Sequence, residues 1–227
     1  MPREQSHHVA RVLRLAAGAA LTLFNGDGAE YDAVVTAVGK SAASVKIREC
    51  RPVDRESSLE IVLGQALSSG ERMDYTVQKA VELGAAAIHP LAASRSVVRL
   101  DAERAAKRVA HWQSVAIAAC EQCGRNRVPP VAPVATLESW LAQHGARHAG
   151  ALRVLLSPRA GTRLRDLPAP GGTIVLLAGP EGGFTQDEEA RARTAGYTPV
   201  RLGPRVLRTE TAAVAALAAM QALWGDF

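Results

Sequence analysis

The sequence predicts an α/β protein in which a small β domain precedes a larger domain built on a parallel sheet. Residues 173–178 (TIVLLA) form a continuous apolar run, as expected of a strand that is buried on both faces. From about residue 68 onward, buried runs alternate with segments of helical periodicity. Before that point, short strand-like runs separated by turn residues predict a compact β domain. We therefore expect domains at residues 1–68 and 69–227.

The N-terminal residues 1–15 are predicted to form a short amphipathic helix. Val9, Val12 and Leu13 have helical spacing, with Arg11 and Arg14 on the other face. Four strands of a small β-barrel are expected next, in the runs LTLF, EYDAVVTAV, ASVKIREC and SSLEIVLG. Turn residues at 25–28 (NGDG) and 39–41 separate the first three strands.

The larger domain is predicted to contain alternating helices and strands. Helices are expected at residues 71–84, 101–124, 139–148 and 212–224, and strands at 85–91, 153–156 and 173–178. Thr185 and Glu188 form a capping-box pattern that begins a further helix. The last helix is apolar all round, which predicts that it lies inside the domain or in a dimer interface.

The charge distribution suits an anionic partner. Lys and Arg number 27 against 22 Asp and Glu, and residues 71–227 supply the whole net charge of +5. A basic excess of this kind is typical of nucleic-acid binding, although 23 of the 27 basic residues are arginines, which a nucleotide bias of the genome would also produce.

The cysteines predict neither disulfides nor a metal site. An odd number of three, without a signal peptide, indicates a reducing, cytoplasmic location. Cys120 and Cys123 form a C-x-x-C pair, but a structural zinc site would need a second pair of ligands. No run approaches the roughly 20 apolar residues of a transmembrane helix.

The main candidate site is the glycine loop, residues 179–183 (GPEGG), which directly follows the strand at 173–178. Its glycines allow close approach of the backbone to a ligand, and open α/β sheets bind ligands at the carboxyl ends of their strands. The loop lacks both the G-K-[ST] of a Walker A motif and the G-x-G-x-x-G of dinucleotide sites. A smaller nucleoside-containing ligand fits better, and a purely structural turn is the alternative.

The second candidate site is the arginine loop, residues 202–211 (LGPRVLRTET). Arg205 and Arg208 are suited to bind phosphate or polarise a carbonyl, and Glu210 to accept a proton or orient an arginine. The alternative is that Thr209 or Thr211 caps the last helix and Glu210 complements its dipole. A third segment, residues 121–125, contains a Glu and an Arg four positions apart, which is also the spacing of a surface ion pair.

Together these segments carry a family resemblance. GPEGGFTQDEE and LGPRVLRTETA, with QKAVELG, IHPLAASRSVV and EQCGRNRVPPV, resemble the RsmE-type small-subunit rRNA methyltransferases of the SPOUT superfamily. HHVARVLRL and LFNGDGAEYDA resemble the PUA-like β-barrel of that family. The resemblance implies a SPOUT α/β domain with a trefoil knot and a homodimer. It also implies methyl transfer from S-adenosylmethionine to N3 of a uridine in 16S rRNA of the small ribosomal subunit.

The resemblance also implies roles for individual residues. The methyl donor is expected to contact Leu156, Ser157, Gly179, Pro180, Glu181, Gly182, Gly183, Leu202, Gly203 and Leu207. Arg208 is expected to stabilise charge on the uracil, and Glu210 to act as the base or to orient Arg208; Glu181 is a weaker candidate. RNA contacts are expected from Arg11, Arg14, Arg125 and Arg205. Two features depart from the family pattern: the N-terminus is short, and Ser69 stands where many relatives have a lysine. Both departures bear on how RNA docks more than on methyl transfer.

Three alternative functions are compatible with the residues. A SPOUT enzyme that modifies another rRNA or tRNA base, or a ribose 2′-hydroxyl, would share the donor pocket. A non-enzymatic RNA-binding protein would keep the basic surface without binding the donor. A nucleotide-dependent α/β enzyme would need the phosphate motifs that this sequence lacks.

Overall fold

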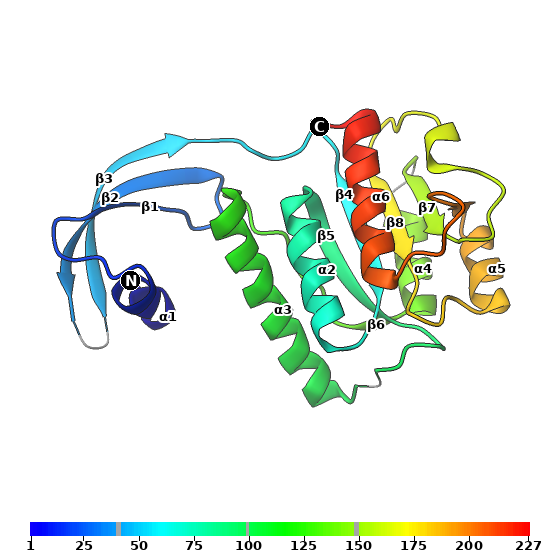
Figure 1. Cartoon of the computed structure of the whole chain (residues 1–227), viewed down its shortest axis with the longest axis horizontal. Coiled ribbons are helices and arrows are strands. Elements are labelled where there is room, and N and C mark those ends of the chain that lie inside the picture. Colours follow the sequence, from blue (N-terminus) through cyan, green and yellow to red (C-terminus); the bar gives the residue numbers. More distant parts are fainter. Residues whose placement is uncertain (40–41, 99, 148–149) are drawn as a thin grey trace. The chain divides into compact units, whose positions relative to one another are not determined.

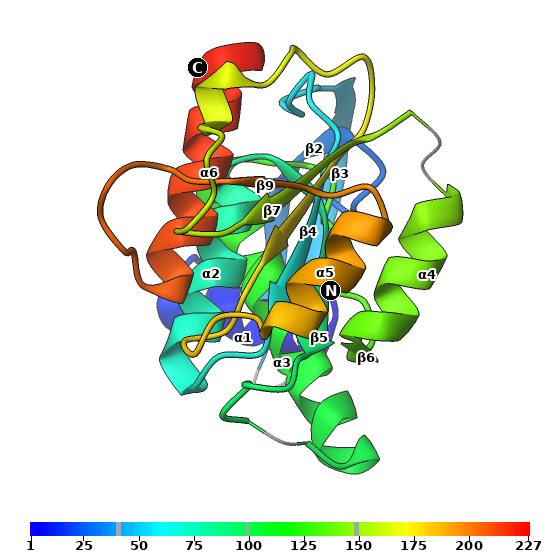
Figure 2. The same ribbon diagram turned by 90° about the vertical axis from the view of Figure 1, so that its right-hand side faces the viewer.

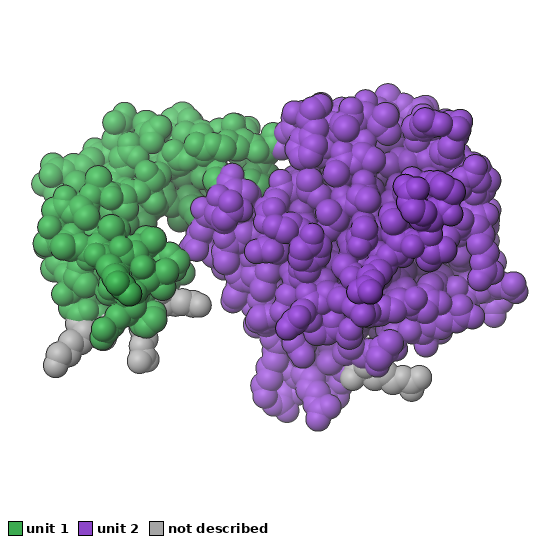
Figure 3. Space-filling view, viewed as in Figure 1, with its two compact units in different colours: residues 1–56, 124–128 green, residues 57–123, 129–227 purple. Residues whose placement is uncertain are grey.

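A computed structural model describes residues 1–39, 42–98, 100–147 and 150–227 of the chain. The chain divides into two compact units, shown in different colours in Figure 3. The first unit comprises Met1–Glu56 and Gly124–Val128, and the second comprises Ser57–Cys123 and Pro129–Phe227. Among the described residues, no helix is both long enough and apolar enough to cross a membrane.

The first unit contains a three-stranded antiparallel sheet in the order β1-β2-β3. The strands are β1 (Ala20–Leu23), β2 (Ala29–Val38) and β3 (Ala43–Pro52), preceded by helix α1 (Arg3–His7) and the π-helix η1 (His8–Val12). The turn predicted at residues 25–28 joins β1 to β2, and the Asp27 N–H donates to Asn25 Oδ1 within it. The turn predicted at 39–41 lies partly outside the described residues.

The N-terminal helix is confirmed, but its predicted apolar face is wrong. Val9 is buried against Val35 and Ala43, whereas Val12 is 61% exposed and Leu13 is 51% exposed. Leu13 lies beyond the last residue of the π-helix His8–Val12. Because each π-helical turn holds more residues than an α-turn, α-helical spacing does not describe which side chains share a face in this segment.

The short segment Gly124–Val128 packs against the end of β3 within the first unit. Arg55 Nη1 donates to the Gly124 carbonyl at 3.0 Å, and Asn126 Nδ2 donates to the Val53 carbonyl at 3.1 Å. Arg125 forms an ion pair with Glu56. Gly124–Val128 follows a helix of the second unit in the sequence but packs as part of the first unit.

The second unit is built on a six-stranded sheet in the order β6-β5-β4-β8-β7-β9, with every pair parallel. The strands are β4 (Ile61–Ala66), β5 (Ala85–Ala92), β6 (Ala135–Thr136), β7 (Leu152–Leu156), β8 (Ile174–Ala178) and β9 (Thr198–Val200). The helices are α2 (Gly70–Glu82), α3 (Ala102–Cys123), α4 (Leu137–Arg147), α5 (Gln186–Thr194) and α6 (Thr209–Trp224), with a 3₁₀ turn η2 (Leu164–Asp166). The predicted fold class, an α/β domain on a parallel sheet after a small β domain, is confirmed.

The assignment of SSLEIVLG to the β domain is wrong. These residues lead into β4, which lies between β5 and β8 in the parallel sheet, with Gly64 opposite Leu177 in register. All six residues of β4 are buried, because helices cover both faces of this sheet. The compact units accordingly divide between Glu56 and Ser57, ahead of the limit expected at residue 68.

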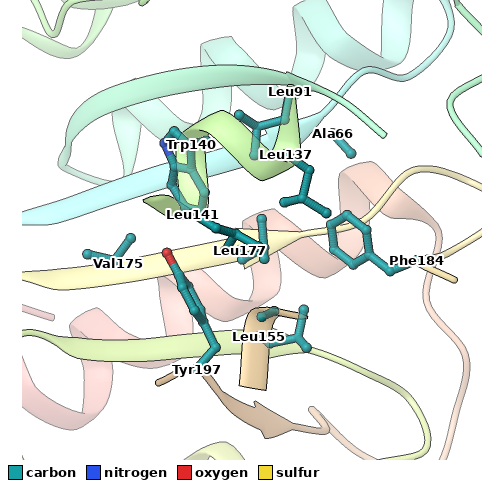
Figure 4. Packing of buried hydrophobic residues seen from close by; sticks show 11 residues of the cluster. Ala66, Leu91, Leu137, Trp140, Leu141, Leu155, Val175, Leu177, Phe184 and Tyr197 are labelled. Atoms are coloured by element: carbon teal, nitrogen blue, oxygen red, sulfur yellow. The ribbon is translucent and has the colours of Figure 1, made fainter. Parts of the chain in front are cut away.

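The helices of the second unit form two layers around the sheet. Helices α2, α3 and α6 cover one face, and α4 and α5 cover the other (Figures 1 and 2). On the α4 and α5 face, Trp140 and Tyr197 pack with Leu91, Leu155, Val175, Leu177 and other apolar residues (Figure 4). Trp140 lies directly over Gly64, where a Cβ atom would come within 2.5 Å of its ring. This core requires a glycine in the middle of a buried strand.

Strand β8 lies between β4 and β7, although it follows both in the sequence. The carboxyl ends of β4, β8, β7 and β9 are therefore neighbours, and the loops that follow them open on the same edge of the sheet. In open parallel sheets this edge, where the strand order reverses, is where ligands bind.

Candidate functional site

A cavity of about 980 Å³ opens at this edge of the sheet. Its walls are the ends of β7, β8 and β9 and the loops that follow them, together with Arg72 on α2 and Arg95 after β5. All ten residues expected to contact the donor line it: Leu156, Ser157, Gly179, Pro180, Glu181, Gly182, Gly183, Leu202, Gly203 and Leu207. The cavity is at the upper end of the range of about 300–1,000 Å³ that small-molecule sites occupy.

The glycine loop is held in one shape by hydrogen bonds at several points. Thr209 Oγ1 donates to the Gly179 carbonyl at 2.6 Å, and Arg95 Nη1 donates to the Gly182 carbonyl at 3.1 Å. Within the loop, the Gly183 N–H donates to the Pro180 carbonyl at 2.8 Å, and Gly183 has a φ of +66° that favours glycine. The loop is thus a preorganised wall of backbone groups.

Glu181 is held by the start of α2. Its Oε1 accepts from the Ser69 N–H at 3.0 Å, from Ser69 Oγ at 3.2 Å and from Arg72 Nη1 at 3.0 Å. Burial would raise the pKa of Glu181, but the hydrogen bonds from Ser69 and Arg72 outweigh it, and the pKa lies below its usual value. The carboxylate therefore stays ionised and fixes the loop, which makes it a poor base.

Gly182 lines the cavity and also lies close against Arg95. A Cβ atom on Gly182 would come within 3.1 Å of Arg95 Cβ. The steric limit at this glycine is therefore set by Arg95, which also donates to the Gly182 carbonyl.

The arginine loop ends in an unusual helix start. Arg208 is the N-cap residue of α6, and it makes no side-chain capping hydrogen bond. The expectation that Thr209 caps the helix is wrong, because its hydroxyl donates to Gly179 and accepts from Gln65 Nε2 at 3.1 Å. Thr211 is likewise no cap, since it lies inside the helix.

Arg208 and Glu210 differ in how they meet the cavity. Arg208 is exposed and lines it. The Glu210 side chain is 15% exposed and lies 4.0 Å from Arg72 Nε through its Oε1. Among the described residues, Glu210 Oε2 has no hydrogen-bond partner. A buried carboxylate oxygen without a partner is costly, so this atom is available to a bound ligand.

Arg72 is the site residue that sequence reasoning missed. It lines the cavity and reaches both Glu181 and Glu210. Its position in the first turn of α2, directly after a buried strand, was a usable signal. With β4 assigned to the β domain, the loop after β4 is not expected at the edge of the sheet where ligands bind.

Four exposed arginines line the cavity without a carboxylate partner among the described residues. Arg95, Arg159, Arg205 and Arg208 are exposed, line the cavity, and form no ion pair in the part of the chain that the structure describes. Arginine is well suited to bind phosphate, so the mouth of the cavity is an electrostatic site for a polyanion.

The other residues expected to contact RNA lie in the first unit. Arg11 and Arg14 are exposed, and Arg14 has a φ of 52°, which is uncommon for a residue other than glycine. Arg125 is 5% exposed, and both its Nε and Nη2 donate to Glu56. Its guanidinium is thus directed into the first unit, where Glu56 is its ion-pair partner.

The predicted capping box at the start of α5 is confirmed. Thr185 N–H donates to Glu188 Oε2 at 2.8 Å, and Glu188 N–H donates to Thr185 Oγ1 at 3.1 Å. The Ser94 N–H also donates to Glu188 Oε1 at 2.7 Å, which ties the loop that carries Arg95 to α5. Among the described residues, no cluster of His, Cys, Asp and Glu could hold a metal ion.

Comparisons with known proteins agree with this geometry. A family model described as an RNA methyltransferase domain matches residues 55–221, and one described as an RNA methyltransferase PUA domain matches residues 2–48. The chain belongs to the RNA methyltransferase family. The match to the methyltransferase domain begins at residue 55, so it includes β4.

Relatives of this methyltransferase chain align along nearly its whole length. The small-subunit rRNA methyltransferase E of Bacillus subtilis is 32% identical and covers 96% of the chain and 87% of its own length. The structure of the same enzyme from Neisseria gonorrhoeae, bound to S-adenosylmethionine, is 44% identical, with a TM-score of 0.92 over 100% of this chain and 92% of that one. A methyltransferase of Legionella pneumophila with bound S-adenosylmethionine is 42% identical, with a TM-score of 0.95 over the same shares.

Proposed function

We propose that this protein transfers a methyl group from S-adenosylmethionine to N3 of a uridine in 16S rRNA of the small ribosomal subunit. The observation that carries the proposal is the cavity at the carboxyl ends of β7, β8 and β9, which contains every residue that the family resemblance assigns to the donor. The names of the relatives from Neisseria and Bacillus support the choice of small-subunit rRNA as substrate.

The residues of the cavity fit the proposed donor. Leu156, Leu202 and Leu207 supply apolar surface for a flat nucleoside, and the carbonyl and N–H groups of the glycine loop supply polar edges. When bound, S-adenosylmethionine supplies an electrophilic methyl group on its sulfonium. The loop is already anchored at Gly179 and Gly182, so little ordering is needed when the donor binds.

Arg208 and Glu210 are proposed as the catalytic residues. Uridine N3 carries an imide proton that must leave as N3 bonds to the methyl carbon. Glu210 Oε2, which has no partner among the described residues, is proposed to accept that proton or to orient Arg208. Arg208 would stabilise the negative charge that develops on the uracil carbonyls. Glu181 is not proposed as the base, because Ser69 and Arg72 already occupy its Oε1.

The RNA is proposed to dock on the arginines around the cavity and on the first unit. Arg205 and Arg208 on the arginine loop would contact the substrate strand. Arg11 and Arg14, in the first unit, are proposed as further RNA contacts. The protein is also proposed to act as a homodimer. Leu223 is exposed near the end of α6, which is a largely apolar helix. This exposed apolar side chain supports an apolar interface there.

The decisive experiment is methylation of small ribosomal subunits with donor labelled in the methyl group. We expect a single modified uridine, mapped by primer extension and identified as 3-methyluridine by mass spectrometry of the nucleosides. Arg208→Ala and Glu210→Ala are each expected to lower turnover by about 10²–10³-fold while the Kd for the donor stays within about threefold. Arg104→Ala, on the exposed surface of α3, is the matched control for loss of a positive charge.

The outcomes separate the alternatives. A different methylated base, or a methylated ribose, would assign another substrate to the same donor pocket. Donor binding without methylation of any RNA, or RNA binding without donor binding, would contradict the proposed activity. Wild-type turnover in both variants would remove Arg208 and Glu210 from the catalytic role.

A further inference from the structure

We propose that Arg72 is a positioning residue that couples the glycine loop to the carboxylate of Glu210. This inference rests on the proposed function, since it assigns a role within that same site. Its starting observation is that one guanidinium reaches two carboxylates from different loops: Nη1 lies 3.0 Å from Glu181 Oε1, and Nε lies 4.0 Å from Glu210 Oε1.

On one side, Arg72 and Ser69 anchor the glycine loop to α2. Ser69 is the N-cap residue of α2, and its side chain makes no cap of its own. Instead, the Glu181 carboxylate reaches in from the glycine loop and accepts from the Ser69 N–H, a group at the helix end that would otherwise lack a partner. The carboxylate thus lies at the positive end of the α2 dipole as well as beside Arg72. Ser69, Arg72 and the α2 dipole thus all stabilise the Glu181 carboxylate.

On the other side, the positive charge of Arg72 faces one oxygen of Glu210 and not the other. Glu210 Oε1 faces Arg72 Nε, while Oε2 is buried and has no hydrogen-bond partner among the described residues. At 4.0 Å the positive charge of Arg72 attracts Oε1 without a hydrogen bond, which favours one orientation of the carboxylate and does not consume Oε2. That arrangement suits a group that must present one oxygen to a ligand.

The backbone of Arg72 is fixed in the first turn of α2. Its carbonyl accepts from Thr76 Oγ1 at 2.9 Å, and its N–H donates to the Ser69 carbonyl at 3.1 Å in the first turn of α2. Helix α2 packs on α6, the helix that begins with Thr209 and Glu210. One guanidinium on this anchored helix thus lies beside both carboxylates, so a shift of the glycine loop would change the position of Arg72 relative to Glu210.

Removal of Arg72 should therefore affect turnover more than donor binding. In Arg72→Ala we expect the Kd for S-adenosylmethionine, measured by calorimetry, to rise about tenfold, because one anchor of the glycine loop is lost while those at Gly179 and Gly182 remain. We expect single-turnover methylation at saturating donor to fall about 100-fold, because Glu210 loses its orientation. Arg72→Lys should restore donor affinity but only part of the rate, since the N–H groups of an ammonium lie on one atom and cannot span two separate carboxylates as those of the planar guanidinium do.

A double-mutant cycle tests the coupling directly. Glu210→Gln should lower the rate on its own, and Arg72→Ala combined with Glu210→Gln should be no slower than the slower single variant. Arg104→Ala is the control, because it removes an arginine from an exposed ion pair on α3. Thermal unfolding of each variant shows whether the measured rates belong to folded protein.

The results distinguish this inference from the proposed function. If wild-type protein binds the donor but methylates no RNA, the proposed function fails, and the donor affinity of Arg72→Ala still tests the loop anchor. Fully additive effects of Arg72→Ala and Glu210→Gln on the rate would overturn the coupling. So would an Arg72→Ala variant that has a lower unfolding temperature but normal rate and Kd, because Arg72 would then be only structural.

Discussion

Thr209 Oγ1 donates a hydrogen bond of 2.6 Å to the carbonyl oxygen of Gly179, and this bond joins the two loops of the site. Thr209 is the first residue of α6 and directly follows Arg208, while Gly179 opens the glycine loop after β8. Gln65 Nε2, at the end of β4, donates to the same threonine oxygen at 3.1 Å. One buried hydroxyl therefore connects the ends of two strands to the helix that carries Glu210.

Loss of this hydroxyl should weaken donor binding. Thr209→Val keeps the shape of the side chain, but it leaves the Gly179 carbonyl and Gln65 Nε2 without their short hydrogen bonds, at a cost of about 1–3 kcal/mol. We expect the Kd for S-adenosylmethionine in calorimetry to rise at least fivefold. Thr194→Val is the control, because Thr194 Oγ1 donates only to a carbonyl within exposed α5. Equal affinities of wild-type protein and Thr209→Val would show that the bond does not shape the donor site.

Gly64 should tolerate no side chain. An added Cβ would come within 2.5 Å of the Trp140 ring and 3.1 Å of Leu91 Cδ1, inside a closely packed core. We expect Gly64→Ala to lower the free energy of unfolding by about 1–3 kcal/mol, measured by urea denaturation. Gly171→Ala is the matched control, since a Cβ at Gly171 meets nothing within 4 Å. A stability equal to that of the wild type would mean that Trp140 moves aside without cost.

Glu188 should make stability depend on pH. Burial would raise the pKa of Glu188, but hydrogen bonds from the N–H groups of Ser94 and Thr185 outweigh it and hold the pKa below the ordinary value of 4.5. A carboxyl with a lowered pKa in the folded state stabilises the protein above pH 4.5, and this contribution is lost as the pH falls through the lowered pKa. We expect Glu188→Gln to be less stable than wild type at pH 7 and the difference to shrink below pH 4.5, in urea titrations at each pH.

The control for that titration is Glu103→Gln. Glu103 also lies in the first turn of a helix, but its side chain is exposed and forms an ion pair with Lys107 on the same helix. Its substitution should change stability by a few tenths of a kcal/mol at most. A pH-independent difference between Glu188→Gln and wild type would contradict the ionised capping box.

Arg205 should contribute to RNA affinity through charge. It is exposed at the rim of the cavity and has no carboxylate partner among the described residues. If it contacts a phosphate, Arg205→Ala should reduce the slope of log K against log salt concentration by about 0.7–0.9. Fluorescence anisotropy with a 16S rRNA fragment at several salt concentrations measures this slope. Arg104→Ala should leave the slope unchanged, and an unchanged slope in Arg205→Ala would exclude the phosphate contact.

Local pattern was enough to predict much of this protein. The continuous apolar run of β8, the helical spacing of α2 and α3, and the Thr185 and Glu188 capping box all depend on neighbours a few residues apart. The motifs of the glycine loop and the arginine loop also lie within short segments, so their family resemblance could name ten of the residues that line the cavity. Their family resemblance agrees with the match to the RNA methyltransferase domain.

Only the tertiary structure decided which strand joins which sheet and which side chains meet across it. An apolar run such as β4 is compatible with either unit until its hydrogen-bonded neighbours, β5 and β8, are known. The partners of Arg72, Thr209 and Arg125 lie 109, 30 and 69 positions away in the sequence, respectively. Such contacts arise because the sheet brings the ends of distant strands to one edge, and no local periodicity encodes that distance.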